Sequence, residues 1–143
     1  MDINNLYRQV IMDHYKNPQN KGLVNDGNYL TVHMNNPSCG DDIVIQCLLE
    51  DNIVKDIKQA GTGCSICCSS ASVMSVSLKG KTKEDALKII NEFYELIKGN
   101  EYNKDVLTGD AIVYQGVSQF PARVKCATLA WKAIEKGLIN KED

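Results

Sequence analysis

The chain has 143 residues, of which 43% are hydrophobic and 24% charged, and its formal net charge is -2. We expect a single domain over residues 1–143, long enough to bury a core without disulfides. The near-neutral charge argues against nucleic acid or an anionic membrane surface as a partner, and no apolar run is long enough to predict a membrane span. The first ten residues do not resemble a secretion signal, so we expect a cytoplasmic protein. In a reducing compartment its six cysteines serve as packing groups, metal ligands or reactive thiols.

The first half of the chain predicts one helix followed by three strands. Apolar residues recur at helical spacing over residues 4–16 and stop at the turn formers Pro18 and Gly22. Alternating apolar and polar residues then predict a strand over residues 29–34, which the turn formers NNPSCGDD end. Two further strands follow at short intervals, with residues 43, 45, 47 and 49 sharing a face of the first and residues 53–59 forming the second. Consecutive strands with short connections favour an antiparallel meander.

The second half of the chain predicts helices. Helical spacing begins at residue 64, and Thr82 is a good N-cap for an amphipathic helix that ends at Gly99. Residues 100–119 predict only a short turn or helix, and a last helix over residues 121–137 opens with a proline. A sheet followed by helices predicts an α+β fold with the helices packed on one face of the sheet.

Cys39 and Asp41 lie together in the loop Pro-Ser-Cys-Gly-Asp between two predicted strands. In locally extended backbone, residues two apart point to the same side, so this thiol and carboxylate form a plausible pair of metal ligands. The alternative is a turn that happens to contain a cysteine, with Asp41 bonding its own backbone.

Three further cysteines crowd the stretch GTGCSICCSSAS, residues 61–72. Cys64 stands at the expected helix start, where unpaired N–H groups and the helix dipole stabilise a thiolate, so it is the strongest candidate for a reactive or ligating thiol. Cys67 and Cys68 follow among small residues, and we expect both to pack against a neighbouring element. The Cys64-Ser-Ile-Cys67 spacing also fits a zinc knuckle or a thioredoxin-type dithiol. A zinc ribbon would need a second such pair, and a thioredoxin-type motif would need parallel strands, and the sequence predicts neither. Cys47 shares a strand face with apolar residues and is expected to be buried.

Cys126 belongs to the last predicted helix, in the stretch FPARVKCATLAW. The polar side chains of that helix form one arc: Lys125, Thr128, Lys132, Glu135 and Lys136. Arg123 lies outside the arc, one turn before Cys126, and is therefore expected to point into the buried side. A guanidinium placed there needs an anion, such as a cluster of thiolates or carboxylates. Alternatively, Arg123 reaches solvent from the first turn along its aliphatic stem.

In combination, Cys39 with Asp41, Cys64 after Gly-x-Gly, and Cys126 in the last helix resemble the Cys-x-Asp, Cys and Cys pattern of the U-type iron-sulfur cluster assembly proteins, the NifU N-terminal or IscU-like family. The stretch LYRQVIMDHYKNPQNKG is similar to the opening helix and Asn-Pro turn of that family. The resemblance covers essentially the whole chain and implies the SufE/IscU-like fold, with an N-terminal helix, a three-stranded antiparallel sheet and helices on one face.

Within the family, the chain resembles the SufU branch more than the IscU scaffolds. The interval between Cys64 and Cys126 is longer than in the scaffolds, and FPARVKCATLAW is similar to the SufU C-terminal motif. Scaffolds carry a histidine directly before the last cysteine, where this chain has Lys125, and both His14 and His33 are remote in sequence. The segment QFPAR stands where scaffolds offer Leu-Pro-Pro-Val-Lys to a chaperone.

The resemblance implies a tetrahedral zinc held by Cys39, Asp41, Cys64 and Cys126, with Arg123 as the counter-charge for a site of formal charge about -2. It also implies that Cys39, in its loop, is the catalytic group and accepts a persulfide. The sulfur donor would be a SufS-like, pyridoxal-phosphate-dependent cysteine desulfurase, and the recipients other cluster assembly proteins. Any activity would be that of a sulfurtransferase acting with the desulfurase.

Two alternatives remain for the same residues. In an IscU-type scaffold the four ligands hold iron while a [2Fe-2S] cluster is built, and thiolates suit iron as well as zinc. A zinc-stabilised adaptor would hold zinc without any persulfide forming on Cys39.

Overall fold

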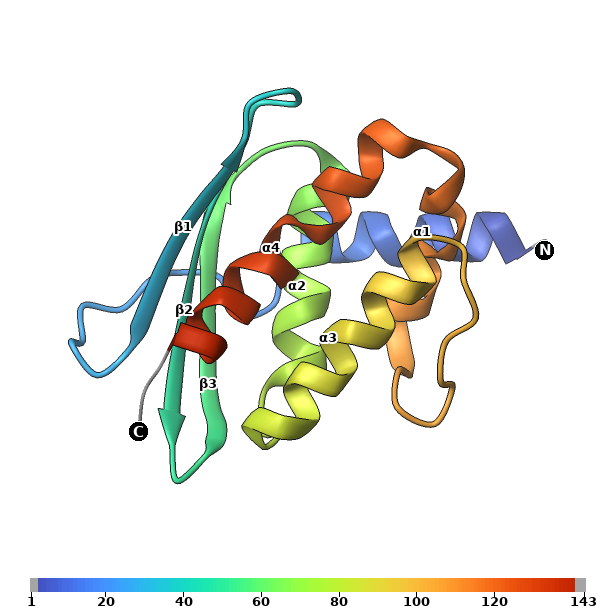
Figure 1. Ribbon diagram of the computed structural model, residues 1–143. Helices are drawn as coiled ribbons and strands as arrows, with labels where there is room; N and C mark the ends of the chain where they lie inside the picture. The colour runs from blue at the N-terminus through green and yellow to red at the C-terminus, as the bar shows by residue number, and fades with distance from the viewer. Residues whose placement is uncertain (1–2, 141–143) are drawn as a thin grey trace.

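The computed structural model describes residues 3–140 (Figure 1). The elements in chain order are helix α1 (Ile3–Lys16), strands β1 (Leu30–Asn36), β2 (Asp41–Glu50) and β3 (Ile53–Thr62), helices α2 (Ser65–Leu78) and α3 (Lys83–Ile97), the 3-10 helix η1 (Gly109–Gln119) and helix α4 (Pro121–Asn140). The strands of this region form an antiparallel sheet in the order β1-β2-β3. Among residues 3–140, every helix is too short or too polar to cross a lipid bilayer.

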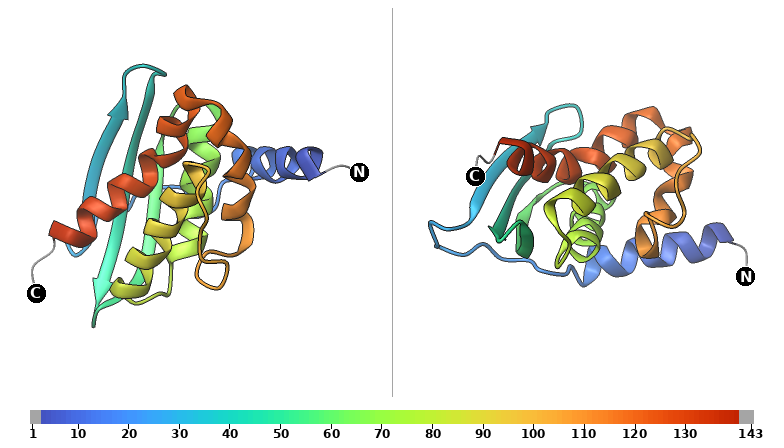
Figure 2. Two further views of the ribbon diagram at one scale, coloured as in Figure 1. Left: turned by 45° about the vertical axis from the view of Figure 1, so that its right-hand side comes forward. Right: turned by 60° about the horizontal axis from the view of Figure 1, so that its bottom comes forward.

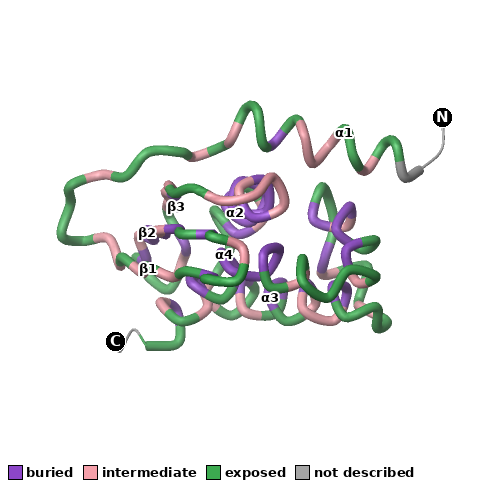
Figure 3. Tube along the Cα trace, turned by 90° about the horizontal axis from the view of Figure 1, so that it is seen from above, coloured by how far each residue is buried: buried purple, intermediate pink, exposed green. Residues whose placement is uncertain are grey.

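The helices α2, α3 and α4 lie on one face of the sheet, which confirms the predicted α+β arrangement (Figure 1, Figure 2). Alternate residues of β2 point toward these helices and are buried: Ile43, Ile45, Cys47 and Leu49. This burial confirms Cys47 as a packing thiol. Helix α1 lies away from the sheet, against α2 and η1, and most of its residues are exposed or half-buried (Figure 3).

An aromatic cluster joins α3, η1 and α4 in the core. The ring of Phe93 stacks on Trp131 with 4.0 Å between centroids, and Tyr114 meets the same phenylalanine edge-on at 6.0 Å. Serines of α2 satisfy the polar ends of these side chains: Trp131 Nε1 donates to Ser70 Oγ at 2.9 Å, and the Tyr114 hydroxyl is hydrogen-bonded to Ser69 Oγ at 2.6 Å. The small residues that follow Cys64 therefore serve helix packing and hydrogen bonding together.

The start of α3 follows a local signal, whereas two later helices are longer than predicted. Thr82 caps α3 as predicted, its side-chain oxygen accepting the Asp85 N–H at 3.1 Å. Residues 109–119 form a longer 3-10 helix than the short turn expected there. Helix α4 continues past Gly137 to Asn140. At Gly137 an added Cβ would lie 3.3 Å from Val32 Cγ2, so this glycine serves the close packing of α4 on β1 and does not end the helix.

Thr128 was expected on the polar arc of the last helix, but this prediction is wrong. Its relative exposure is only 3%. The hydroxyl donates to the carbonyl of Val124, one turn earlier, at 2.9 Å, so the side chain can be buried without an unpaired polar group.

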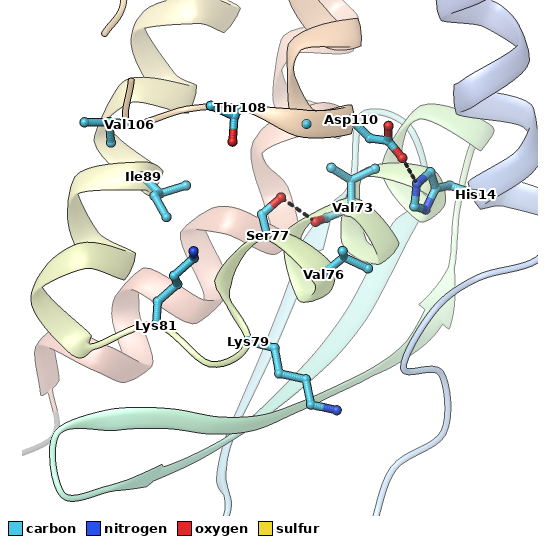
Figure 4. A pocket seen from close by; sticks show the side chains of 11 residues that line it. His14, Val73, Val76, Ser77, Lys79, Lys81, Ile89, Val106, Thr108 and Asp110 are labelled. Atoms are coloured by element: carbon cyan, nitrogen blue, oxygen red, sulfur yellow. Dashed lines mark hydrogen bonds and ion pairs between the residues drawn. The ribbon is translucent and has the colours of Figure 1, made fainter. Parts of the chain in front are cut away.

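His14 fastens α1 to the rest of the molecule. Its Nδ1 lies 2.8 Å from Ser72 Oγ on α2. Its Nε2 lies 2.8 Å from Asp110 Oδ2 on η1, a contact that Figure 4 shows. The backbone N–H of Gln19 also donates to Ser72 Oγ, at 2.8 Å. Serine, histidine and aspartate are thus in contact, but Ser72 is 0% exposed and no substrate can reach its hydroxyl. The three side chains form a structural tether beside a pocket of about 280 Å³.

We predict that Phe93→Ala lowers the free energy of unfolding by about 3–5 kcal/mol, because it removes a ring stacked inside the core. Urea denaturation followed by circular dichroism measures the change. The chain's other phenylalanine provides the control, since Phe120 is 60% exposed and its replacement by alanine should change stability by only about 0.5 kcal/mol. Equal losses in the two variants would contradict the assigned core.

Candidate metal centre

Three segments that are distant in sequence meet at one end of the molecule. They are the turn between β1 and β2, the start of α2 and the start of α4, all at the top of Figure 1. Cys39 lies in the turn, Cys64 is the N-cap residue of α2, and Cys126 lies in the second turn of α4. The placement of Cys64 at a helix start is as predicted, although its side chain does not cap the helix.

The structure brings three of the four predicted ligands together. One ligand atom each from Cys39, Asp41 and Cys126 lie within 4.8 Å of one another. In a tetrahedral zinc site, two sulfur ligands are roughly 3.8 Å apart, given a Zn–S bond of about 2.3 Å. Asp41 and Cys126 are buried, whereas Cys39 is half-buried and accessible from solvent. The trio is therefore near ligand spacing, with one thiol on the outer side.

Cys64 falls outside this trio but borders it. Its backbone N–H donates to Asp41 Oδ1 at 3.0 Å. The Cys64 thiol also acts on Cys126, since it raises the pKa of the Cys126 thiol. The fourth predicted ligand thus lies against two members of the trio, on the α2 side.

The two glycines before Cys64 allow the start of β2 to approach this closely. A Cβ on Gly63 would lie 2.5 Å from Asp41 Oδ1, and a Cβ on Gly61 would lie 2.2 Å from the backbone oxygen of Asp42. Gly61 also has a φ of +146°, which side chains rarely tolerate. The Gly-Thr-Gly segment makes room for the Asp41 carboxylate, a role that the sequence alone does not reveal.

The thiol of Cys126 lies in an environment that opposes its ionisation when no metal is bound. Burial is the largest cause that raises its pKa, and its hydrogen bonds with Asp41, Cys39 and Cys64 raise it further. A buried carboxylate among thiols is a donor set that a cation would stabilise. Three sulfurs and one oxygen fit zinc, which accepts both ligand types in tetrahedral geometry, and they also fit iron.

Arg123 was expected to point into the buried side of the last helix, and this prediction is wrong. The residue is exposed, because the first turn of α4 lies at the protein surface. Its guanidinium nevertheless faces the site from the rim. A hydrogen bond with Cys126 raises the pKa of Arg123, and the charges of Cys64 and Cys39 raise it as well. The side chain reaches solvent and still supplies a positive charge beside the thiols.

Cys67 and Cys68, the two cysteines within α2, are not among the three residues whose ligand atoms meet. Cys67 is fully buried, and burial raises the pKa of its thiol, which confirms the packing prediction. Cys68 is only half-buried and donates to the carbonyl of Gly63 at 3.6 Å. It lines a pocket of about 430 Å³ with Lys21, so its side chain packs on one side and meets solvent on the other.

Asn36 is a residue of the site that sequence reasoning missed. Its side chain is buried and donates toward both Asp41 Oδ2, at 3.4 Å, and Cys126 Sγ, at 3.7 Å. In the sequence it is one of several turn formers in NNPSCGDD. Only its adjacency to the turn that carries Cys39 could have drawn attention to it.

The sequence matches the family model described as "NifU-like N terminal domain" over residues 6–127. The chain belongs to this family. It is 52% identical to the "Zinc-dependent sulfurtransferase SufU" of Bacillus subtilis (strain 168), over 99% of this chain and 95% of that protein. It is 39% identical to the "Iron-sulfur cluster assembly scaffold protein IscU" of Streptococcus pyogenes serotype M1, over 95% of this chain and 84% of that protein.

A solved structure supports the same family. It is that of a candidate iron-sulfur cluster assembly scaffold protein for the SUF system from Fervidobacterium islandicum AW-1, with 33% identity and a TM-score of 0.83, covering 96% of this chain and 99% of that one. These similarities place the chain among iron-sulfur cluster assembly proteins, and the identity values favour the SufU type over the IscU type.

We predict that Gly63→Ala lowers the affinity for zinc by about 10–100-fold, because the new methyl group displaces Asp41 Oδ1. Competition with a chromophoric chelator measures the affinity. Gly27→Ala is the matched control, since an added Cβ there meets nothing within 4 Å. An unchanged affinity in Gly63→Ala would contradict the role assigned to Gly63 in placing Asp41.

Proposed function

We propose that this protein is a zinc-dependent sulfurtransferase of iron-sulfur cluster assembly, which accepts persulfide sulfur on Cys39 from a cysteine desulfurase. The observation that carries the proposal is the meeting of Cys39, Asp41 and Cys126 within 4.8 Å, with Cys39 the most accessible of the three. The 52% identity to a protein named as a zinc-dependent sulfurtransferase supports it.

The proposed zinc ligands are Cys39, Asp41, Cys64 and Cys126. When bound, zinc keeps its ligand thiols ionised at neutral pH and ties the three segments together. Three thiolates and a carboxylate leave the site with an excess of negative charge, and the guanidinium of Arg123 at the rim offsets part of it. The buried side chains that join the sheet to the helices form one cluster, which supports treating residues 1–143 as one domain.

In the proposed reaction, the Cys39 thiolate attacks the outer sulfur of the persulfide on the desulfurase. A new S–S bond forms at Cys39 while the S–S bond of the donor breaks, and the donor cysteine leaves as a thiolate. The outer sulfur moves without net oxidation or reduction. A thiolate of the next protein can take the sulfur from Cys39 by the same exchange.

The surroundings of Cys39 suit this role better than those of Cys126. Its sulfur makes a long contact, 4.0 Å, to the carbonyl of Ala122, and the neighbouring Gly40 adopts a φ of +71° in the turn. Cys126 is 0% exposed on a helix, where an incoming persulfide cannot reach it. We infer that the sulfur donor is a SufS-like enzyme that uses pyridoxal phosphate.

The alternative function is that of an IscU-type scaffold on which a [2Fe-2S] cluster is assembled. The 39% identity to a protein named as such a scaffold favours it, and the same donor set suits iron. Against it, the residue directly before Cys126 is the exposed Lys125, at the position where the IscU scaffolds carry a histidine. The two histidines of the chain do not take the place of that histidine, because each contacts other groups. His14 is hydrogen-bonded to Ser72 and Asp110, and His33 is hydrogen-bonded to Asp42.

We predict that Cys39→Ala retains its fold but gains no sulfur when incubated with a desulfurase and cysteine, because the accepting thiolate is gone. Intact-protein mass spectrometry should show one added sulfur on the wild type and none on the variant. The desulfurase should also lose its stimulation. Cys68→Ala, which removes a half-buried thiol outside the site, is the control and should behave as the wild type. Sulfur added to Cys39→Ala would contradict the acceptor assignment.

We further predict one zinc per chain in the isolated protein, because thiolates and a carboxylate in this arrangement favour a tetrahedral ion. Elemental analysis checks the zinc, and absorption spectroscopy after anaerobic reconstitution checks for a cluster. Stable visible absorption that Cys126→Ala abolishes would instead support the scaffold. Zinc without any sulfur transfer to Cys39 would indicate an adaptor.

A further inference from the structure

Asn36 is the last residue of β1 and lies directly opposite Asp41 in the β1–β2 pairing. Its relative exposure is 7%, which is low for a polar residue at the end of an edge strand. The preceding residue, Asn35, is exposed and pairs with Asp42, so its side chain points to the other face of the sheet. Two identical residues thus stand side by side, with one facing the metal centre and the other facing solvent.

The Asn36 amide bridges two proposed ligands that come from different elements. Nδ2 donates toward Asp41 Oδ2 on β2 at 3.4 Å and toward Cys126 Sγ on α4 at 3.7 Å. The backbone of the same residue closes the ligand turn, since the Cys39 N–H donates to the Asn36 carbonyl at 3.1 Å. Asn36 is therefore in contact with three of the four proposed ligand residues.

These contacts hold the Asp41 carboxylate from two sides. Oδ1 accepts the Cys64 N–H at 3.0 Å, and Oδ2 accepts the Asn36 amide. Asp41 is 1% exposed, so water does not replace either donor. A neutral amide is well suited here, because it donates to a carboxylate and a thiolate without adding charge or competing as an anion.

We infer that Asn36 is a positioning residue of the metal centre, which fixes Asp41 and Cys126 as lasting ligands and leaves Cys39 as the one that departs. The inference rests on the proposed zinc site. The Asn36 amide donates to Asp41 and Cys126, whereas its described contact with Cys39 is through the backbone, and the Cys39 sulfur makes a long contact of 4.0 Å to the Ala122 carbonyl. The ligand that receives sulfur is thereby distinguished from the ligands that stay.

The test compares substitutions at the two neighbouring asparagines. Asn36→Ala removes the donors, and Asn36→Asp replaces them with a carboxylate that repels Asp41. We expect the zinc affinity to fall about 10–100-fold in Asn36→Ala, as is usual for groups that orient metal ligands, and further in Asn36→Asp. Asn35→Ala and Asn35→Asp make the same chemical changes on the solvent face and should stay within about twofold of the wild type, because they touch no ligand.

Cobalt substitution separates positioning from a general effect on folding. The visible bands of bound Co²⁺ and its sulfur-to-metal charge-transfer absorption report ligand geometry, so they should shift in the Asn36 variants and remain unchanged in the Asn35 variants. Among the four proposed ligands, iodoacetamide should label Cys39 first in the zinc-loaded wild type, whereas Asn36→Ala should also expose Cys126 to labelling. Metal-free thermal unfolding serves as the measure of fold.

Wild-type zinc affinity and cobalt spectra in the Asn36 variants would overturn the inference, as would equal losses at positions 35 and 36. If Asn36→Ala does not fold, Asn36→Gln decides the matter, since it keeps the amide but displaces it by one methylene. A shifted cobalt spectrum in folded Asn36→Gln would support positioning, and an unchanged one would refute it. Failure of the wild type itself to bind zinc would refute the proposed metal site instead.

Discussion

The buried carboxylate of Asp41 is the group on which the arrangement of this end of the molecule depends. A charge with 1% exposure is costly unless donors or a cation surround it. The backbone N–H of Cys64 and the amide of Asn36 supply the donors. To reach them, the start of β2 must lie against the N-terminus of α2, and the glycine at position 63 leaves the space for it. This contact places Cys64 beside Asp41, two residues along the chain from Cys39.

Much of this could be predicted from the sequence because the signals are local. Strand alternation, the Thr82 cap and the helix start at Cys64 each depend on a few neighbouring residues, and all agree with the structure. The resemblance to a family then joined Cys39, Asp41 and Cys126 across the chain, and the structure brings these three together.

The features that sequence reasoning missed depend on contacts between distant segments. The role of Asn36 exists only because α4 brings Cys126 beside the end of β1. The polar arc of the last helix predicts the direction in which each side chain points from the helix axis. It does not predict which turns of the helix are covered by the rest of the protein. Arg123 is exposed because its helical turn lies at the surface, and Thr128 is buried because its helical turn packs on the core. Both predictions were wrong because the sequence pattern does not tell which turns of the helix are buried.

The spread of the ligands over the chain also bears on the unfolded state. Cys39 and Asp41 come from one hairpin, while Cys64 and Cys126 lie near the starts of two separate helices, so a bound ion would act as a reversible cross-link that closes long loops of the chain. Cross-links of this kind stabilise a protein chiefly by lowering the conformational entropy of its unfolded ensemble. In the proposed cycle, Cys39 leaves while Asp41 stays, and the loops from Asp41 to the two helices remain closed. The bound ion would thus continue to restrain the chain through Asp41 and the two helices, while the segment that carries Cys39 and its sulfur is free to move.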